Sequence, residues 1–253
     1  AVTTGVQNTF VGGLAGDGTD DGTNNVAVGF EALSANCGSG NVILGCRAGK
    51  LTTADNNTFV GLNAGTAVTS GANNTFVGAL CGDATDDGVQ NVAVGHSALS
   101  ANCGNGNVAV GGEALSPCTG AFNTALGKDA GVSVTSGSNN MFLGFQSGIT
   151  GSPGGQQTTS SDRIALGDEN VTNCHIQVDW TVASDQRDKT DFTALDLGLD
   201  FVKALAPVTY KWDKRSKYGD KTADDYDLNA QTPDGTHKED WLDIGFKAQE
   251  VQT

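Results

Sequence analysis

Basic and aromatic side chains are scarce in this sequence. Only 14 Lys and Arg residues oppose 29 Asp and Glu residues, which gives a formal net charge of −15. A nucleic-acid-binding surface needs clustered basic side chains to neutralise phosphates, so this charge argues against a nucleic-acid partner. No stretch approaches the roughly 20 apolar residues that a membrane-spanning helix requires, so we expect no membrane insertion.

Metal-binding motifs are lacking as well. The six Cys residues form no CxxC pair, and the three His residues occur without an HxH or HExxH motif. We therefore expect no metal site and no cofactor. We interpret the Cys residues as small thiols buried inside a repeated structure, with disulfides as the alternative. Two acidic loops are interpreted as solvated turns, with calcium sites as the alternative: Asp17, Asp20 and Asp21, and Asp83, Asp86 and Asp87.

The uneven composition divides the chain. All but four of the 36 Gly residues precede residue 169, whereas ten of the 14 Lys and Arg residues lie from Arg187 onward. We therefore predict a repeat region at residues 1–168, a connector at 169–183 and a C-terminal domain at 184–253. Because the sequence begins inside the repeat pattern, we expect it to be a piece of a longer protein.

A short phrase recurs throughout residues 1–168: Asn, two or three small or apolar residues, then Gly. Successive copies start 16 or 17 residues apart, and four of them form a longer repeat of 66 residues. A period this short is typical of stacked coils rather than of a globular enzyme core. The copies start at Asn8, Asn25, Asn41, Asn57, Asn74, Asn91, Asn107, Asn123 and Asn140, with a decayed copy at Arg163.

Each copy predicts a short β-strand. In NVAVG, Val26 and Val28 face one way, whereas Asn25 and Ala27 face the other, which is the period of a strand. The following Gly ends the strand or permits a positive φ. We predict a second short strand in the next piece, such as FEALSAN, and ladders of hydrogen-bonded Asn side chains along the stack. Because a narrow coil holds few aromatic rings, we expect the strand Phe residues to lie where several chains meet.

The phrase N-x-A-V-G-x-x-A-L appears where FEAL, HSAL and GEAL follow NVAVG. It resembles the head repeats of trimeric autotransporter adhesins. That resemblance implies a mainly β fold, a left-handed parallel β-roll assembled as a homotrimer. The alternating period of 16 and 17 residues is longer than in that family, so a triangular β-helix stays open as an alternative.

Three phrases follow in order after residue 183: SDQRDKTD, GLDFVKALAPVTYKW and IGFKAQEV. They resemble the C-terminal intramolecular chaperone of phage endosialidases, tail spikes and tail fibres. We predict a small α+β domain, with an amphipathic helix over residues 192–206 and strands in PVTYKW and DIGFKAQEV. That family continues into long trimeric helices, whereas this sequence stops soon after AQEV, so we expect the domain to be truncated here.

The same resemblance implies a self-cleaving dyad of Ser184 and Lys189, with the cut between Ala183 and Ser184. A Ser hydroxyl is a poor nucleophile near neutral pH unless a base takes its proton, and a Lys with a lowered pKa is such a base. The dyad would cut its own chain once and have no external substrate. Alternatively, these residues only begin the chaperone fold. Three neighbours would support the dyad: Asp185, Arg187 and Asp191.

These features together predict a structural virion protein, made in the host cytoplasm: the trimeric shaft of a phage tail fibre or tail spike. Its expected partners are further copies of itself, other tail proteins and a host-surface glycan or protein. The alternative is the head of a trimeric bacterial surface adhesin, which the repeats fit equally well. A polysaccharide-degrading spike would need paired carboxylates along a groove, and residues 1–168 supply no convincing pair.

Overall fold

A computed structural model describes residues 4–175 without a gap and, beyond them, residues 208–211, 213, 218, 230, 232–238, 240 and 242–245. The chain divides into two compact units, Ala1–Gln177 and Val178–Thr253, each of which is described by itself. Among the described residues, no helix combines the length and the hydropathy that crossing a membrane would require.

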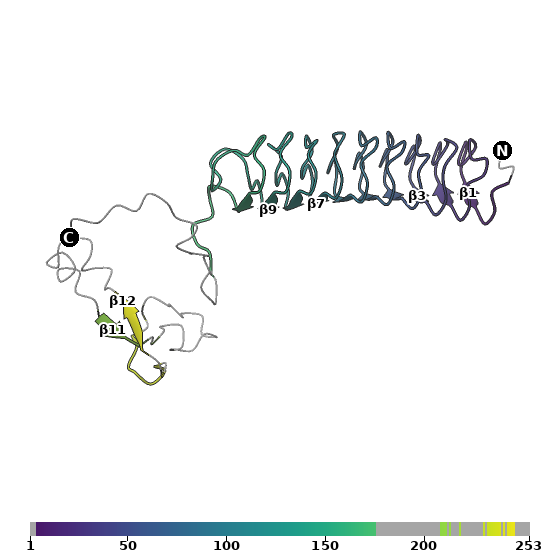
Figure 1. The fold of residues 1–253 in the computed structure, drawn as a ribbon. Coiled ribbons are helices and arrows are strands. Elements are labelled where there is room, and N and C mark those ends of the chain that lie inside the picture. Colours follow the sequence, from purple (N-terminus) through teal and green to yellow (C-terminus); the bar gives the residue numbers. More distant parts are fainter. Residues whose placement is uncertain are drawn as a thin grey trace, which may run out of the picture. The chain divides into compact units, whose positions relative to one another are not determined.

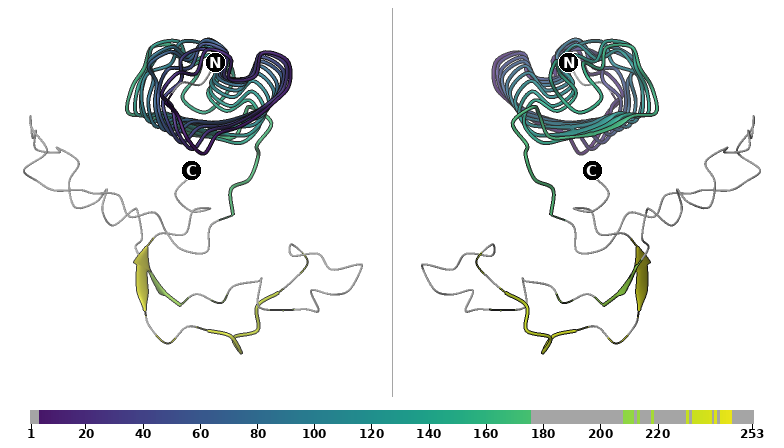
Figure 2. Two further views of the ribbon diagram at one scale, coloured as in Figure 1. Left: turned by 90° about the vertical axis from the view of Figure 1, so that its right-hand side faces the viewer. Right: turned by 90° about the vertical axis from the view of Figure 1, so that its left-hand side faces the viewer.

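The first unit is a stack of coils, each of which contributes one strand of three residues (Figure 1). The ten strands form one parallel sheet in sequential order, so each strand pairs with the next copy of the repeat. Seen along the stack, the coils lie one behind another with similar outlines (Figure 2). The predicted mainly β fold with a parallel β-solenoid is therefore confirmed. The strands are β1 (Thr9–Val11), β2 (Val26–Val28), β3 (Val42–Leu44), β4 (Thr58–Val60), β5 (Thr75–Val77), β6 (Val92–Val94), β7 (Val108–Val110), β8 (Thr124–Leu126), β9 (Met141–Leu143) and β10 (Ile164–Leu166).

The predicted second strand of each coil is wrong. The piece after each strand consists of turns, in which residues such as Glu31 and Leu33 have φ values of 54° and 50°. Left-handed residues only two positions apart turn the chain repeatedly, so it cannot extend into a strand. The Gly that ends each strand does have a positive φ, as predicted. At Gly78, φ is +140°, and a Cβ atom would lie 2.4 Å from the carbonyl oxygen of Gly95.

The Asn residues form the predicted ladder. Asn25 Oδ1 accepts a hydrogen bond of 2.8 Å from the backbone N–H of Asn41, and Asn25 Nδ2 donates one of 2.9 Å to the carbonyl of Gly38. Corresponding N–H to Oδ1 bonds connect each Asn of the repeat to the next, from Asn8 to Asn140, and the last one accepts from Arg163 N. These bonds satisfy backbone groups that the short strands leave unpaired.

The coil interior is filled by complementary pairs. Each pair joins the middle residue of a strand to the residue six positions later. Where the strand has Phe, as at Phe76, the later position is Gly, as at Gly82, in all four such coils; Ala is paired with Leu in three coils, as at Ala93 and Leu99. A Cβ atom on Gly82 would lie 2.3 Å from the Phe76 ring, so only Gly leaves room for that ring. In these seven coils a large residue faces a small one, as close packing requires. The pair Ala125 and Gly131 departs from this pattern.

Aromatic rings therefore lie inside the coils, and the expectation that the strand Phe residues meet other chains is wrong for Phe59, Phe76 and Phe142. All three are fully buried, and the rings of Phe59 and Phe76 stack with their centroids 5.0 Å apart. The small turn residues make the interior wide enough for rings. Only Phe10, in the first strand, is partly exposed among the strand Phe residues.

Among the described residues of the second unit, β11 (Val208–Tyr210) pairs antiparallel with β12 (Asp243–Gly245). Both strands lie in phrases for which strands were predicted. The helix predicted for residues 192–206 lies outside the described residues. Near the pair, Tyr218 Oη donates a hydrogen bond of 2.7 Å to Asp213 Oδ1, and Asp213 Oδ2 accepts another from the backbone N–H of Gly235.

Candidate functional site

The outer face of the ten-stranded sheet has no charged side chain. Each strand places its middle residue inside the coil, so its first and third residues face outward. All twenty outward positions of the ten strands hold Val, Leu, Ile, Met or Thr. We call this surface the strand face. It consists of Thr9, Val11, Val26, Val28, Val42, Leu44, Thr58, Val60, Thr75, Val77, Val92, Val94, Val108, Val110, Thr124, Leu126, Met141, Leu143, Ile164 and Leu166.

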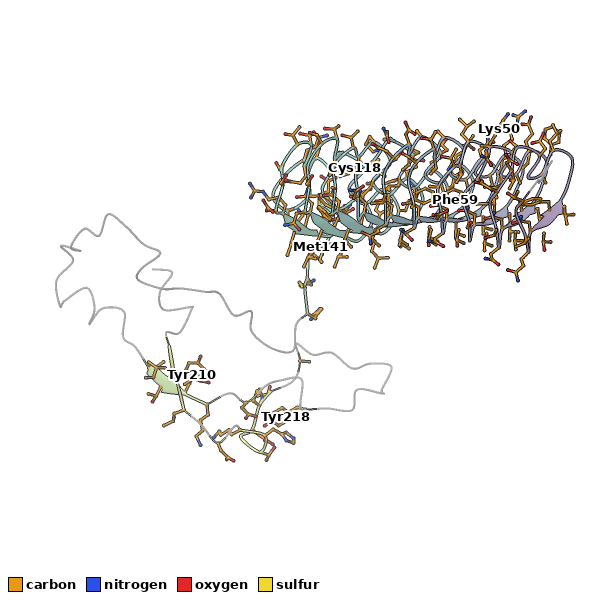
Figure 3. All side chains as sticks on the ribbon, turned by 45° about the vertical axis from the view of Figure 1, so that its right-hand side comes forward. Lys50, Phe59, Cys118, Met141, Tyr210 and Tyr218 are labelled. Carbon is orange, nitrogen blue, oxygen red and sulfur yellow. The ribbon has the colours of Figure 1, made fainter. Side chains whose placement is uncertain are left out.

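Much of the strand face is exposed. Val11 is 56% exposed, Leu126 53% and Ile164 66%, and the side chains on this side, including Met141, project from the stack in Figure 3. Exposed apolar side chains continue past the carboxyl ends of three strands, at Phe30, Leu62 and Phe145. Strands about 4.8 Å apart, each about 10 Å long, give the face an area of about 480 Å². That lies within the range of about 300–600 Å² for the largest apolar patch on a typical monomer, and such patches are often functional.

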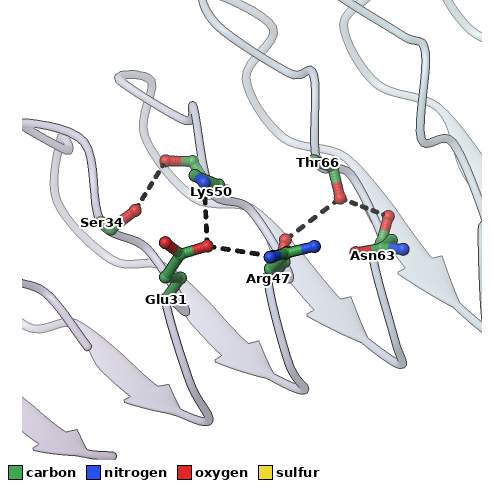
Figure 4. Close-up of polar contacts among 6 residues, drawn as sticks. All are labelled: Glu31, Ser34, Arg47, Lys50, Asn63 and Thr66. Carbon is green, nitrogen blue, oxygen red and sulfur yellow. Dashed lines mark hydrogen bonds and ion pairs between the residues drawn. The ribbon is translucent and has the colours of Figure 1, made fainter. Parts of the chain in front are cut away.

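The charged side chains of the coils lie outside the ten strands, in the turns and loops. Glu31 Oε2 accepts contacts from Arg47 Nε at 3.0 Å and Lys50 Nζ at 2.8 Å, which link successive coils (Figure 4). The hydrogen bond from Lys50 contributes most to holding the pKa of the Glu31 carboxyl below its usual value. The Arg47 and Lys50 side chains reach solvent, so these ion pairs contribute little to stability.

The prediction that the Cys thiols are buried inside the repeated structure is confirmed for four of the six residues. All six Cys residues are free, which excludes disulfides, and four are buried: Cys37, Cys81, Cys103 and Cys118. Cys46 and Cys174 are exposed, contrary to the expectation for all six. Burial raises the pKa of Cys81 to about 12 and that of Cys103 to about 11, so the buried thiols stay protonated and unreactive at neutral pH.

The acidic loops are not assembled as metal sites. In the described part of the chain, no three His, Cys, Asp or Glu side chains come together in a way that could bind a metal ion. One loop carboxylate is unusual. Asp83 Oδ1 is buried without a hydrogen-bond partner, and burial raises the pKa of this carboxyl.

The residues of the predicted dyad lie outside the described residues, so the structure gives no geometry for them. This holds for Ser184 and Lys189, for Ala183 on the other side of the predicted cut, and for the supporting Asp185, Arg187 and Asp191.

Comparisons with known proteins bear on this same segment. Residues 184–253 match the family described as the chaperone of endosialidase, which supports the predicted C-terminal chaperone domain. Searches of curated proteins and of solved structures found no match to the chain. The class that emerges is a parallel β-solenoid with a C-terminal segment of the endosialidase-chaperone type.

Sequence reasoning found the β-solenoid but missed its strand face as a site. The signal was present, because the alternation of Val26 and Val28 with Asn25 and Ala27 already separates two faces. The alternation alone does not say which of the two faces is buried. In the structure the Asn and Ala side chains face the interior of the coil, so the Val side chains face outward.

Proposed function

We propose that residues 1–168 form the shaft of a fibre in which three copies of this chain pack their strand faces against one another. The single observation that carries this proposal is the strand face itself: twenty outward positions, all uncharged, along a chain of net charge −15. The match of residues 184–253 to a chaperone family supports it, because such a domain has a role in trimerisation.

Assembly of such a shaft raises a register problem. Neighbouring coils present nearly the same outward residues, so a slip of one coil still brings apolar side chains onto apolar side chains. Contacts within the coils therefore cannot fix the alignment of three chains. A separate domain at one end can align them before the faces close, and this is the role we assign to residues 184–253. Slow pairing of long-range β-structure makes such help valuable.

We further propose that the chaperone segment removes itself by cleavage between Ala183 and Ser184. Ser184 Oγ attacks the carbonyl carbon of Ala183 while Lys189 takes the hydroxyl proton, and Lys189 then returns that proton to the Ser184 nitrogen as the peptide C–N bond breaks. The resulting ester between Ala183 and Ser184 Oγ is hydrolysed by water, which leaves a carboxylate on Ala183 and restores the Ser184 hydroxyl at the start of the C-terminal fragment. Loss of the aligning domain would then trap the assembled shaft kinetically, because separated chains could not realign.

A denaturing gel and mass spectrometry of the expressed chain test the cleavage. The wild-type chain is expected to yield two fragments, with the C-terminal one starting at residue 184. The Ser184→Ala and Lys189→Ala variants are expected to stay intact, whereas the control Ser216→Ala is cut like wild type. Intact wild-type chain, or equal cutting of Ser184→Ala, would show that this dyad does not act.

The setting we propose is a phage tail fibre or tail spike, a virion component that contacts other tail proteins and a host-surface glycan or protein. The chaperone match favours this setting. The N-x-A-V-G-x-x-A-L repeats are the observation that favours the alternative, the head of a trimeric bacterial adhesin. Both functions need the same packed strand faces, so the oligomeric state tests the shaft in either case.

A further inference from the structure

Phe122 occupies a backbone position that aromatic residues rarely take. The residue before each Asn of the ladder has a positive φ, and that of Phe122 is 59°. Gly adopts this conformation freely, and Asn and Asp tolerate it, whereas bulky residues adopt it rarely. Turn residues such as Leu33 and Leu99 also have positive φ in this chain, but they are fully buried. The other residues in this column are Gln7, Asn24, Gly40, Asn56, Asn73, Gln90, Gly106, Asn139 and Asp162.

Burial does not compensate for this strain, because Phe122 is 64% exposed. Residues in unfavourable backbone conformations cluster at ligand-binding sites, where the surrounding structure holds them in place. The ring of Phe122 rests beside Gly106 of the preceding coil, where a Cβ atom would lie 2.9 Å from its Cδ1 atom. Gly40 lies beside Asn56 in the same way, so the change from Asn to Phe at the equivalent position is what places one exposed ring here.

The same ring lines a pocket of about 280 Å³ at the amino-terminal ends of β8, β9 and β10. Polar side chains of the next two coils complete this pocket: Asn139, Asp162 and Arg163. Asn139 Nδ2 donates a hydrogen bond of 2.7 Å to Asp162 Oδ1, which fixes both side chains. The Arg163 guanidinium makes no ion pair or hydrogen bond with the residues that the structure describes, so its donors are available to a ligand.

An exposed aromatic ring beside an amide, a carboxylate and a guanidinium suits the chemistry of a sugar. The C–H face of a pyranose ring packs on an aromatic ring, while its hydroxyls pair with planar groups that offer two hydrogen bonds. The pocket lies at the small end of the usual range for ligands, about the size of one or two sugar rings. Asp162 and the net charge of −15 disfavour an anionic sugar.

We propose that the Phe122 pocket binds a neutral pyranose of a host-surface glycan, with Phe122 as the stacking platform and Asp162 and Arg163 as hydrogen-bonding groups. This inference rests on the proposed function, since a fibre displays the site to a cell surface. Thr124, Met141 and Ile164 also line the pocket and belong to the strand face, so the proposal requires that the packed strand faces leave the coils of β8, β9 and β10 open to a ligand.

Saturation-transfer NMR on the full chain tests the proposal, with the methyl glycosides of glucose, galactose, mannose, rhamnose and N-acetylglucosamine as probes. At least one probe is expected to show transfer, strongest at ring protons. Phe122→Asn restores the residue type common in this column, so it is expected to fold normally and yet bind at least tenfold more weakly. Arg163→Ala is expected to weaken binding as well. Phe145→Ala, which removes another exposed ring, serves as the matched control and is expected to bind like wild type.

Absence of transfer for all five probes, or equal binding by wild type and Phe122→Asn, would overturn the proposal. A third result would also overturn the proposal: no sugar binding by any sample, together with dissociation of the Phe122→Asn variant into single chains. In that case Phe122 would hold copies of the chain together instead of binding a sugar. Light scattering on the same samples distinguishes failure of the sugar-binding proposal from failure of the proposed trimeric shaft. A trimer without sugar binding contradicts this inference alone, whereas a monomer contradicts the proposed shaft.

Discussion

Single residues carry the fold through backbone hydrogen bonds and backbone angles. In most coils, one Asn side chain accepts a hydrogen bond from a backbone N–H of the next coil and donates another to a backbone carbonyl of its own coil. The two hydrogen bonds of Asn25 are an example. A Gly at the end of each strand lets successive coils approach more closely than any side chain would allow, as at Gly78. Because buried polar groups are costly to leave unpaired, replacing such a residue removes more than one contact.

Asn74→Ala tests the ladder. Asn74 Oδ1 accepts from the backbone N–H of Asn91, and Asn74 Nδ2 donates to the carbonyl of Gly88, so the substitution leaves two buried groups without partners. We expect a loss of about 2–4 kcal/mol in the free energy of unfolding, measured by urea denaturation. The control Asn173→Ala, at an exposed residue, is expected to change it by less than about 0.5 kcal/mol. Equal effects of the two substitutions would contradict the structural role of the ladder.

Asp83→Asn tests the buried carboxylate. Burial raises the folded-state pKa of Asp83 above 3.8, so the charged form is disfavoured in the fold. Its contribution to stability is greatest below about pH 3.8, where the carboxyl is protonated, and falls as pH rises through the raised pKa. The Asn variant is therefore expected to melt at a higher temperature than wild type at pH 7. Melting curves between pH 3 and 7 should show this advantage shrinking as the pH falls; a constant or reversed difference would refute the assignment.

In seven of the ten coils, the middle residue of the strand and the turn residue six positions later combine a large side chain with a small one, either Phe with Gly or Ala with Leu. The strand could be predicted, because alternation in NVAVG and the spacing of the Asn residues report directly on side-chain direction. The turn could not, because it depends on non-Gly residues such as Leu33 in a left-handed conformation, which composition does not reveal. The interior rings were missed because the room for Phe76 comes from Gly82, six residues away. The pocket at Phe122 combines three coils, which no single repeat shows.

Phe76 and Gly82 provide the test at this scale. Phe76→Ala leaves a cavity and is expected to cost about 3–5 kcal/mol in the free energy of unfolding. Gly82→Leu places its side chain against the Phe76 ring and is expected to destabilise the coil as well. The double variant recreates the pair found at Ala93 and Leu99, so it is expected to be more stable than either single variant. Additive losses in denaturant titrations would contradict the complementary packing.

For the molecule as a whole, the account has one central claim: the strand face packs against other copies of the chain. The face is uniformly uncharged, and its area is that of a surface patch that is often functional. A charge placed at its centre cannot be buried without a large penalty, so it should separate the copies while leaving each coil intact. Val94, in β6, faces outward near the middle of the stack and is 37% exposed.

Light scattering coupled to size-exclusion chromatography tests this claim most directly. In the Ser184→Ala background, which blocks the proposed cleavage, the otherwise wild-type chain is expected to elute with a molar mass three times the 25.7 kDa of one chain. Val94→Asp is expected to elute as a folded single chain, whereas the control Ala84→Asp, which adds the same charge to an exposed turn, should stay trimeric. A molar mass of one chain for the otherwise wild-type chain in that background, or a Val94→Asp variant that remains trimeric, would contradict the packed strand faces.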